Sequence, residues 1–205
     1  KLGTYIMPNT INHISIRAFA ACKISTISFS SNLESTGYSA FAFSDSLKKL
    51  TISPTIKHID NESFYFCKNL EEVTLSEGII SIGERAFNWC FSLKSITIPK
   101  SVNKISNYAF QGCQMLSSIT ALSKIPVDIS NSPNVFEFVN KIGCTLYVPH
   151  GSKTAYQSAD QWKDFLNIVE MEPSYDMPLQ VEAGGLAALL PQSVRDTITY
   201  LALTG

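Results

Sequence analysis

Charged residues are scarce in this chain of 205 residues, and they do not cluster. Asp, Glu, Lys and Arg together make up 16% of the sequence, with a formal net charge of −1, whereas about a quarter is usual. A nucleic-acid-binding protein needs a basic patch or stripe, so we predict no nucleic-acid partner. No apolar run approaches the roughly 20 residues that a transmembrane helix requires. We therefore expect no membrane insertion of this segment.

Motifs for catalysis and metal binding are also missing. The five cysteines show neither C-x-x-C pairs nor the Cys/His spacing of a zinc site. There is no H-E-x-x-H, no nucleophile elbow and no glycine-rich phosphate loop. His13, His58 and His150 stand apart, and isolated surface histidines are mostly just solvated. The sequence thus predicts no metal, no cofactor, no catalytic residue and no enzyme activity.

What the sequence does contain is an internal repeat. Its marker is a small residue, then Phe, two variable residues and Cys, and successive phenylalanines lie 22, 23, 23 and 23 residues apart. These repeat phenylalanines are Phe19, Phe41, Phe64, Phe87 and Phe110. A fixed period in the size range of leucine-rich repeats predicts a solenoid, because one coil cannot bury its own apolar face and must stack on its neighbours. We expect five such coils over residues 1–116.

Two apolar columns predict one short strand per coil. They lie 14 and 12 residues before each repeat phenylalanine, as in Val73 and Leu75 or Ile96 and Ile98, with a hydroxyl residue between them. This period of two indicates a strand with one buried face. Stacked coils would place these strands in one parallel sheet, about 4.8 Å apart. The spacing of Ala86, Cys90 and Leu93 predicts a short helical turn before the next strand.

The cysteines share a repeat position. Four of them follow a repeat phenylalanine by three residues, Ser44 stands at that position in the second coil, and Cys144 is isolated. We expect small buried hydrophobes with free thiols and no disulfide. A bond between neighbouring coils, such as Cys67 to Cys90, is the alternative, and it would need favourable side-chain geometry.

The pattern loosens after Leu116. The next phenylalanine at the repeat position, Phe136, comes 26 residues after Phe110, which predicts an irregular last coil. A strand closed by Pro149 follows, and then a helical or turn-rich segment whose large apolar groups can cover the open core: Tyr156, Trp162, Phe165 and Ile168. We assign residues 117–171 to the last coil and a C-terminal cap, which a solenoid needs for solubility. Residues 172–178 read as a linker, and residues 179–205 as the beginning of a further α+β module.

The repeat resembles a known family. The pattern Lx2ITIPxxVxxIxxxAFxxCxxL, clearest from Leu93 to Leu116, is similar to the BspA-type leucine-rich repeat of bacterial cell-surface proteins. The resemblance extends from Leu2 to Leu116, with a related ending to Met171. It implies a right-handed leucine-rich-repeat solenoid that is exported to the cell surface and recognises or adheres to host or neighbouring-cell proteins. Because Lys1 is not a natural start, we expect a mature or trimmed segment without its signal or anchor.

The outward side of the predicted sheet is the first candidate surface. It would present Thr51, Thr74 and Thr97 in one column and Lys49 and Glu72 in another, a hydroxyl-lined sheet that could meet a protein or a sugar. The alternative is structural: Thr suits strands, and Lys49 and Glu72 would pair across neighbouring strands.

An aromatic column is the second candidate surface. Phe43, Phe66 and Trp89 each lie two residues after a repeat phenylalanine in consecutive coils. If exposed, such a column marks a contact site, because aromatic anchors dominate protein interfaces and also stack on sugars. The alternative to protein recognition is a glycan-capture module, or a non-adhesive scaffold, that uses this column, and coplanar rings would favour a polysaccharide. The structural alternative is that the rings stack on one another and shield the core.

Overall fold

The computed structural model describes residues 3–172. The chain divides into two units, Lys1–Glu172 and Pro173–Gly205, and the first contains all the described residues. The predicted linker after Glu172 and the further module expected over 179–205 lie outside the described residues.

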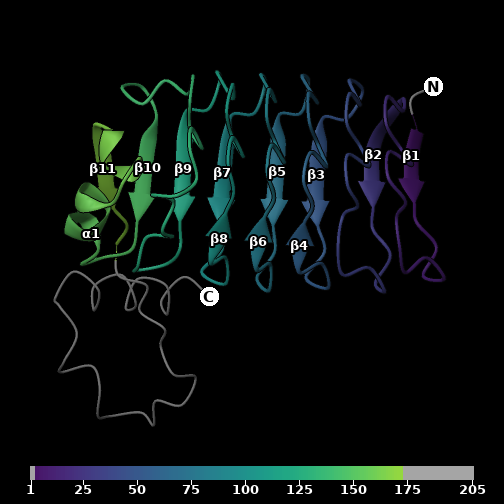
Figure 1. The fold of residues 1–205 in the computed structure, drawn as a ribbon, viewed down its shortest axis with the longest axis horizontal. Helices are drawn as coiled ribbons and strands as arrows, with labels where there is room; N and C mark the ends of the chain where they lie inside the picture. Colours follow the sequence, from purple (N-terminus) through teal and green to yellow (C-terminus); the bar gives the residue numbers. More distant parts are fainter. Residues whose placement is uncertain (1–2, 173–205) are drawn as a thin grey trace, which may run out of the picture. The chain divides into compact units, whose positions relative to one another are not determined.

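The first unit is a solenoid built on one long parallel sheet (Figure 1). Its eight strands follow the order β1, β2, β3, β5, β7, β9, β10, β11, so each coil adds one strand beside the previous one. They are β1 (Gly3–Ile6), β2 (Ile24–Ser28), β3 (Lys49–Ile52), β5 (Glu72–Leu75), β7 (Ser95–Ile98), β9 (Ser118–Ala121), β10 (Thr145–Val148) and β11 (Asn167–Glu170). Buried and exposed residues alternate strictly in β3, β5 and β7. The predicted parallel solenoid is therefore confirmed.

A second, smaller sheet was not expected. Three coils carry an additional short strand, and these strands pair in parallel as β4 (His58–Ile59), β6 (Ser81–Ile82) and β8 (Lys104–Ile105). Two-residue strands leave no alternation in the sequence to detect, because a period of two needs several residues to appear.

The repeat phenylalanines form the centre of the core. From Phe19 to Phe136, neighbouring rings are nearly parallel, with interplanar angles of 3° to 8° and centroid distances of 5.1 to 5.7 Å. The last ring packs against Trp162 and Phe165 of the cap. Phe19 is only partly buried, whereas burial of each of the other five rings contributes about 1.5–3 kcal/mol. The stack links every coil to the next.

The segments around the repeat phenylalanines are turns, which corrects the expected short helices. In each of the six coils, the residues two before and two after the phenylalanine have positive φ. For Arg85 and Trp89 these φ angles are 53° and 57°, which interrupts any right-handed helix. This backbone directs the Phe87 and Trp89 N–H groups to carbonyls of the next coil, at 2.9 and 2.7 Å. Hydrogen bonding between coils thus replaces hydrogen bonding within a helix.

The shared cysteine position makes a ladder of hydrogen bonds. The thiols of Cys67, Cys90 and Cys113 are fully buried, and each donates to the repeat-phenylalanine carbonyl of the preceding coil at 3.1 to 3.3 Å. Ser44 donates its hydroxyl to the Phe19 carbonyl in the same way, at 3.1 Å. Serine therefore takes the place of cysteine because the position needs a small donor.

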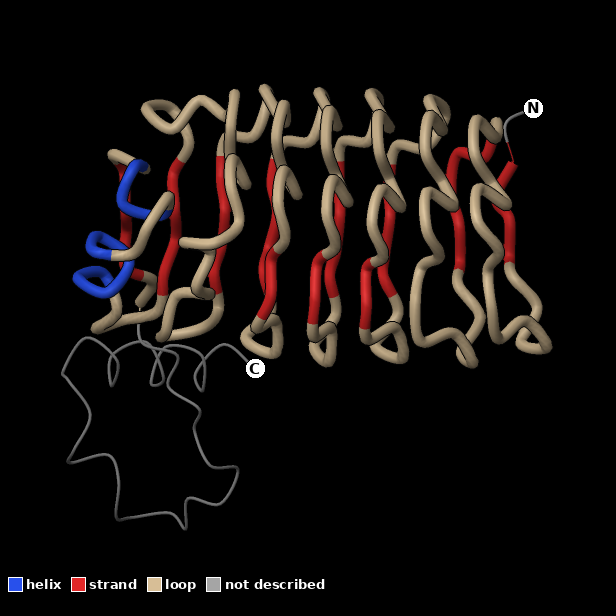
Figure 2. The backbone as a smooth tube through the Cα atoms, viewed as in Figure 1, coloured by secondary structure: helices blue, strands red, loops and turns tan. Residues whose placement is uncertain are grey.

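The cap closes the open end of the core (Figure 2). It consists of α1 (Lys153–Ser158), the 3-10 turn η1 (Trp162–Asp164) and β11. Ile168, expected in a helical or turn-rich segment, lies instead on β11, which adds a last strand beside β10. Trp162 is buried, and its Nε1–H donates to the Val127 carbonyl at 2.9 Å. Tyr156 donates its hydroxyl to the Ser123 carbonyl at 2.9 Å, and burial raises the pKa of this phenol to about 12.

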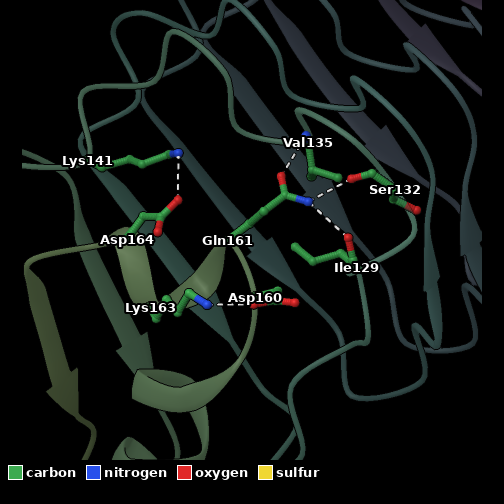
Figure 3. A network of polar contacts seen from close by, with 8 residues as sticks. All are labelled: Ile129, Ser132, Val135, Lys141, Asp160, Gln161, Lys163 and Asp164. Carbon is green, nitrogen blue, oxygen red and sulfur yellow. Dashed lines mark hydrogen bonds and ion pairs between the residues drawn. The ribbon is translucent and has the colours of Figure 1, made fainter.

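One amide side chain holds the irregular last coil to the cap (Figure 3). The Gln161 side-chain oxygen accepts the Val135 N–H at 2.9 Å, and its amide nitrogen donates to the carbonyls of Ile129 and Ser132 at 2.9 and 2.6 Å. An exposed ion pair, Lys141–Asp164 at 3.1 Å, lies beside it. Three backbone groups of a loop without regular structure are satisfied in this way, as buried polar groups require.

Candidate functional site

The outward side of the long sheet is here called the strand face, and in its central strands it presents mostly hydroxyl groups. Thr51, Thr74 and Thr97 are exposed on β3, β5 and β7, and Thr51 lies directly opposite Thr74 in the strand register. Lys49 and Glu72 form an exposed ion pair at 2.9 Å, as the structural alternative expected. An exposed pair contributes at most about 1 kcal/mol, so its main effect here is to cancel both charges.

A second surface, here called the aromatic band, runs along the turns. It comprises the three predicted rings and three further ones, namely Phe43, Tyr65, Phe66, Trp89, Phe91 and Phe138. Every ring contacts at least one other, with centroid distances of 5.3 to 5.9 Å. The band is thus continuous from the second coil to the sixth. Phe138 was missed because the last coil is stretched, although it too lies two residues after a repeat phenylalanine.

The band is partly packed and partly exposed. Phe43 and Phe138, at its two ends, are 49% and 57% exposed, while the rings between them are half-buried. The aromatic residues therefore fit both interpretations in part. The rings pack against one another, as the structural alternative expected, and they also present edges and faces to solvent, as a contact site requires. They are not coplanar, since Phe66 is tilted by 41° against Phe43 and by 82° against Phe91.

Gly112 explains how the band crosses the fifth coil, which has no aromatic ring at the shared position. The Trp89 ring lies over this glycine so closely that a Cβ atom there would approach Trp89 Cε3 to 2.1 Å. The indole thereby reaches Phe138, which it stacks against at 5.6 Å and 19°. A side chain at position 112 would block this contact and divide the band.

The aromatic residues occupy strained backbone positions. Phe43, Phe66, Trp89 and Phe138 have φ angles of 57° to 62°, a region that costs an ordinary residue about 1–2 kcal/mol and that glycine or asparagine would occupy more cheaply. The same positive φ recurs at this position in every coil, at Ala21 and Gly112 too, so it belongs to the turn of the solenoid and does not by itself mark a functional site. The chain carries bulky aromatic residues at these positions despite that cost.

Polar side chains border the band. Asp45 and Lys68, each two residues beyond a ring of the band, form an ion pair at 2.7 Å. On the neighbouring turn positions, the buried Asn88 donates its amide to Gln111 at 2.6 Å, and the half-buried Gln111 donates to Glu137. These bonds tie adjacent coils together, and the Asp45–Lys68 pair is the more exposed polar group. An apolar centre with a polar, hydrogen-bonded rim is the usual anatomy of a protein interface.

The described residues can be compared with the requirements of a metal site and of a reactive thiol. Within residues 3–172, no three His, Cys, Asp or Glu side chains come together as metal ligands would. Burial raises the thiol pKa of Cys67 and Cys113 to about 12, whereas reactive cysteines have lowered pKa values. No helix in the described part of the chain combines the length and apolar character needed to cross a membrane.

Solved structures of leucine-rich repeat proteins share this fold. A leucine-rich repeat protein from Bacteroides ovatus matches with a TM-score of 0.62 and 24% identity, over 83% of this chain and 42% of that one. The T. pallidum leucine rich repeat protein matches with a TM-score of 0.60 and 20% identity, over 71% of this chain and 68% of that one. A leucine rich cell surface protein from Faecalibacterium prausnitzii matches with a TM-score of 0.52 and 22% identity, over 75% of this chain and 34% of that one. This chain therefore spans less than half of the first and third proteins.

The family is identified by sequence. Comparison with curated proteins gave no match. The family model described as "BspA type Leucine rich repeat region" matches six copies over residues 1–124, which is more than half of the chain. Together with the coil geometry, this match shows that the chain belongs to the BspA-type leucine-rich repeat family.

Proposed function

We propose that this chain is a recognition module of a bacterial cell-surface protein, and that it adheres to extracellular or host proteins through the aromatic band. The single observation that carries the proposal is the band itself: six aromatic rings that are partly exposed and that contact one another from the second coil to the sixth. The family membership and the leucine rich cell surface protein from F. prausnitzii support a surface location.

The chemistry of the band suits a protein partner. Aromatic residues supply most of the binding energy at interfaces when they sit centrally and are ringed by polar groups that exclude water. The Phe43 and Phe138 rings offer exposed apolar area at the two ends, and the Asp45–Lys68 pair lies beside Phe43 and Phe66. Because the rings already pack against one another, little side-chain freedom is lost on binding.

A polysaccharide at the aromatic band is the second candidate, and the ring geometry does not favour it. A sugar chain stacks best on rings that share one plane. The rings of the band meet at 38° to 85° in every contact except that between Trp89 and Phe138, which pack face against face. A mixed edge-and-face surface fits apolar protein side chains better.

The test is a binding screen against an array of purified collagen, fibronectin and laminin. The unmodified chain is compared with a Phe43→Ser/Phe138→Ser variant, which alters the two most exposed rings and leaves the phenylalanine core intact. We expect binding to at least one matrix protein and a loss of about tenfold or more in the variant. Thermal melting of each variant checks that the fold is kept.

A Thr51→Ala/Thr74→Ala variant on the strand face is the matched control, and it should bind like the unmodified chain. Loss of binding in this control with retention in the aromatic variant would move the protein site to the strand face. Absence of binding to every matrix protein would refute adhesion to host matrix.

A further inference from the structure

The C-terminal half of the strand face differs in chemistry from the N-terminal half. Strands β7, β9, β10 and β11 lie side by side (Figure 1), and none of their outward side chains is charged. We call these eight positions the neutral face: Ser95, Thr97, Ser118, Thr120, Thr145, Tyr147, Asn167 and Val169. The ion pair Lys49–Glu72 confines charge to the other half.

Charged side chains next to the neutral face are held by other partners. Lys94, which precedes Ser95, pairs with Glu71 at 2.6 Å. Glu170, which follows Val169, accepts the Lys153 N–H at 2.9 Å on the side of α1. A charged ligand would therefore find no free opposite charge on these strands. A neutral ligand could bind without removing water from any charged side chain of the face.

The register arranges the neutral face as two ranks across the four strands. One rank runs through Ser95, Ser118, Thr145 and Asn167, and the other through Thr97, Thr120, Tyr147 and Val169. Ranks of this kind repeat at the strand spacing of about 4.8 Å. Among the hydroxyls of the neutral face, only that of Thr145 has a hydrogen-bond partner within residues 3–172, accepting the Asn167 amide at 2.7 Å. The other hydroxyls can each donate and accept a hydrogen bond.

Tyr147 adds an aromatic ring to the hydroxyl ranks. It lies between Thr120 and Val169 in the register, and its side chain and that of Val169 are 36% and 37% exposed. A phenol combines an apolar face with a polar tip. Beside four free hydroxyls, it offers a stacking surface for the C–H face of a sugar ring, with donors and acceptors within reach of the sugar hydroxyls.

We infer that the neutral face binds a neutral polysaccharide, with Tyr147 as the stacking platform and the Thr97 and Thr120 hydroxyls as hydrogen-bonding partners. This site lies on the sheet, separate from the aromatic band, so it goes beyond the proposed function and can fail or succeed independently of it. Exposed hydrogen bonds contribute little each, so binding depends on several sugar units lying along the ranks together.

Affinity electrophoresis tests this inference, because it detects weak binding of the folded chain. The gels contain starch, xylan, mixed-linkage β-glucan or mannan as neutral probes, and pectate as an anionic probe. We expect at least one neutral polysaccharide to retard the chain and pectate not to. Tyr147→Ala should reduce the retardation constant about tenfold, and Tyr147→Phe, which keeps the ring, should reduce it much less.

Matched threonine variants locate the site within the sheet. Thr97→Val/Thr120→Val removes two hydroxyls from the neutral face and should weaken retardation, while Thr51→Val/Thr74→Val makes the same change in the other half and should not. Several results would overturn the inference: no retardation by any neutral polysaccharide, retardation that Tyr147→Ala leaves unchanged, or pectate retardation that disappears with added salt. Loss of matrix-protein binding in Tyr147→Ala, without any polysaccharide binding, would assign the face to a protein partner instead and also overturn it.

Discussion

Replacing Gly112 by alanine should destabilise the solenoid through two separable effects. The first is backbone strain, because alanine at a φ of 76° costs about 1–2 kcal/mol. The second is a collision, because the new Cβ would lie 2.1 Å from Trp89 Cε3 and must displace an indole held by Phe91 and Phe138, at about 1–3 kcal/mol. Together they predict a loss of about 2–5 kcal/mol in the free energy of unfolding.

Two comparisons separate these effects. Gly151 has nearly the same φ, 77°, and a Cβ atom at that position would meet no other atom within 4 Å, so Gly151→Ala should show the strain alone, about 1–2 kcal/mol. In a Trp89→Ala background the collision is absent, and Gly112→Ala should again cost only about 1–2 kcal/mol. The double-mutant cycle therefore predicts a coupling of about 1–3 kcal/mol between positions 89 and 112.

Urea unfolding of the whole chain, followed by circular dichroism, measures these free energies if the transition is two-state. Equal costs for Gly112→Ala with and without the indole would refute the prediction, because Trp89 could not then lie over Gly112. A cost for Gly112→Ala no larger than that for Gly151→Ala would contradict it equally.

Three further predictions concern the cap, the buried thiols and the surface charges. Trp162→Ala should cost about 3–5 kcal/mol in urea unfolding, because it opens the core end and leaves a buried carbonyl unpaired; a loss below about 1 kcal/mol would show that the indole does not close the core. Burial raises the thiol pKa of Cys67 and Cys113 from 9.0 to about 12, so the unfolded chain loses these protons at lower pH than the folded chain. Stability should therefore fall as pH rises from about 9 to about 12, less steeply in a Cys67→Ser/Cys113→Ser variant, and an unchanged slope there would contradict this. Lys49→Ala should cost less than about 1 kcal/mol, because its pair with Glu72 is exposed, and a larger loss would mean that the pair is coupled to the core.

The regular part of the fold could be predicted because every coil repeats the same solution. Five phenylalanines recur at a nearly constant spacing, and apolar residues lie at fixed distances from each of them. Only one alignment of neighbouring coils then brings all these residues together in the core. The pairing of Lys49 with Glu72 followed from that register alone, since equal repeat lengths place equal positions side by side. The period changes after Phe110, and the prediction was less accurate there. The segment that forms strand β11 was expected to be helical or turn-rich, which was wrong.

The turns show a different limit. The spacing of Ala86, Cys90 and Leu93 suits one face of a helix, and the same three residues are buried by the turns that occur. The spacing of apolar residues cannot distinguish a helical turn from the turns observed here. Burial depends on where the side chains point, and not on which carbonyl accepts a hydrogen bond from each N–H. The positive φ of Arg85 and Trp89 is imposed by hydrogen bonds to the next coil, which no local sequence preference reports.

Sequence alone determined that this protein is a stack of coils with a phenylalanine core and one strand per coil, because periodicity encodes which residues must be buried together. It also named Phe43, Phe66 and Trp89 as a column. Only the tertiary structure decided that Trp89 passes over Gly112 to reach Phe138, that the rings are tilted, and that Tyr147 stands beside Thr120 on an uncharged face. The physical reason is that the period fixes which positions lie side by side, whereas side-chain volume and backbone direction determine how far each ring reaches and how it is tilted.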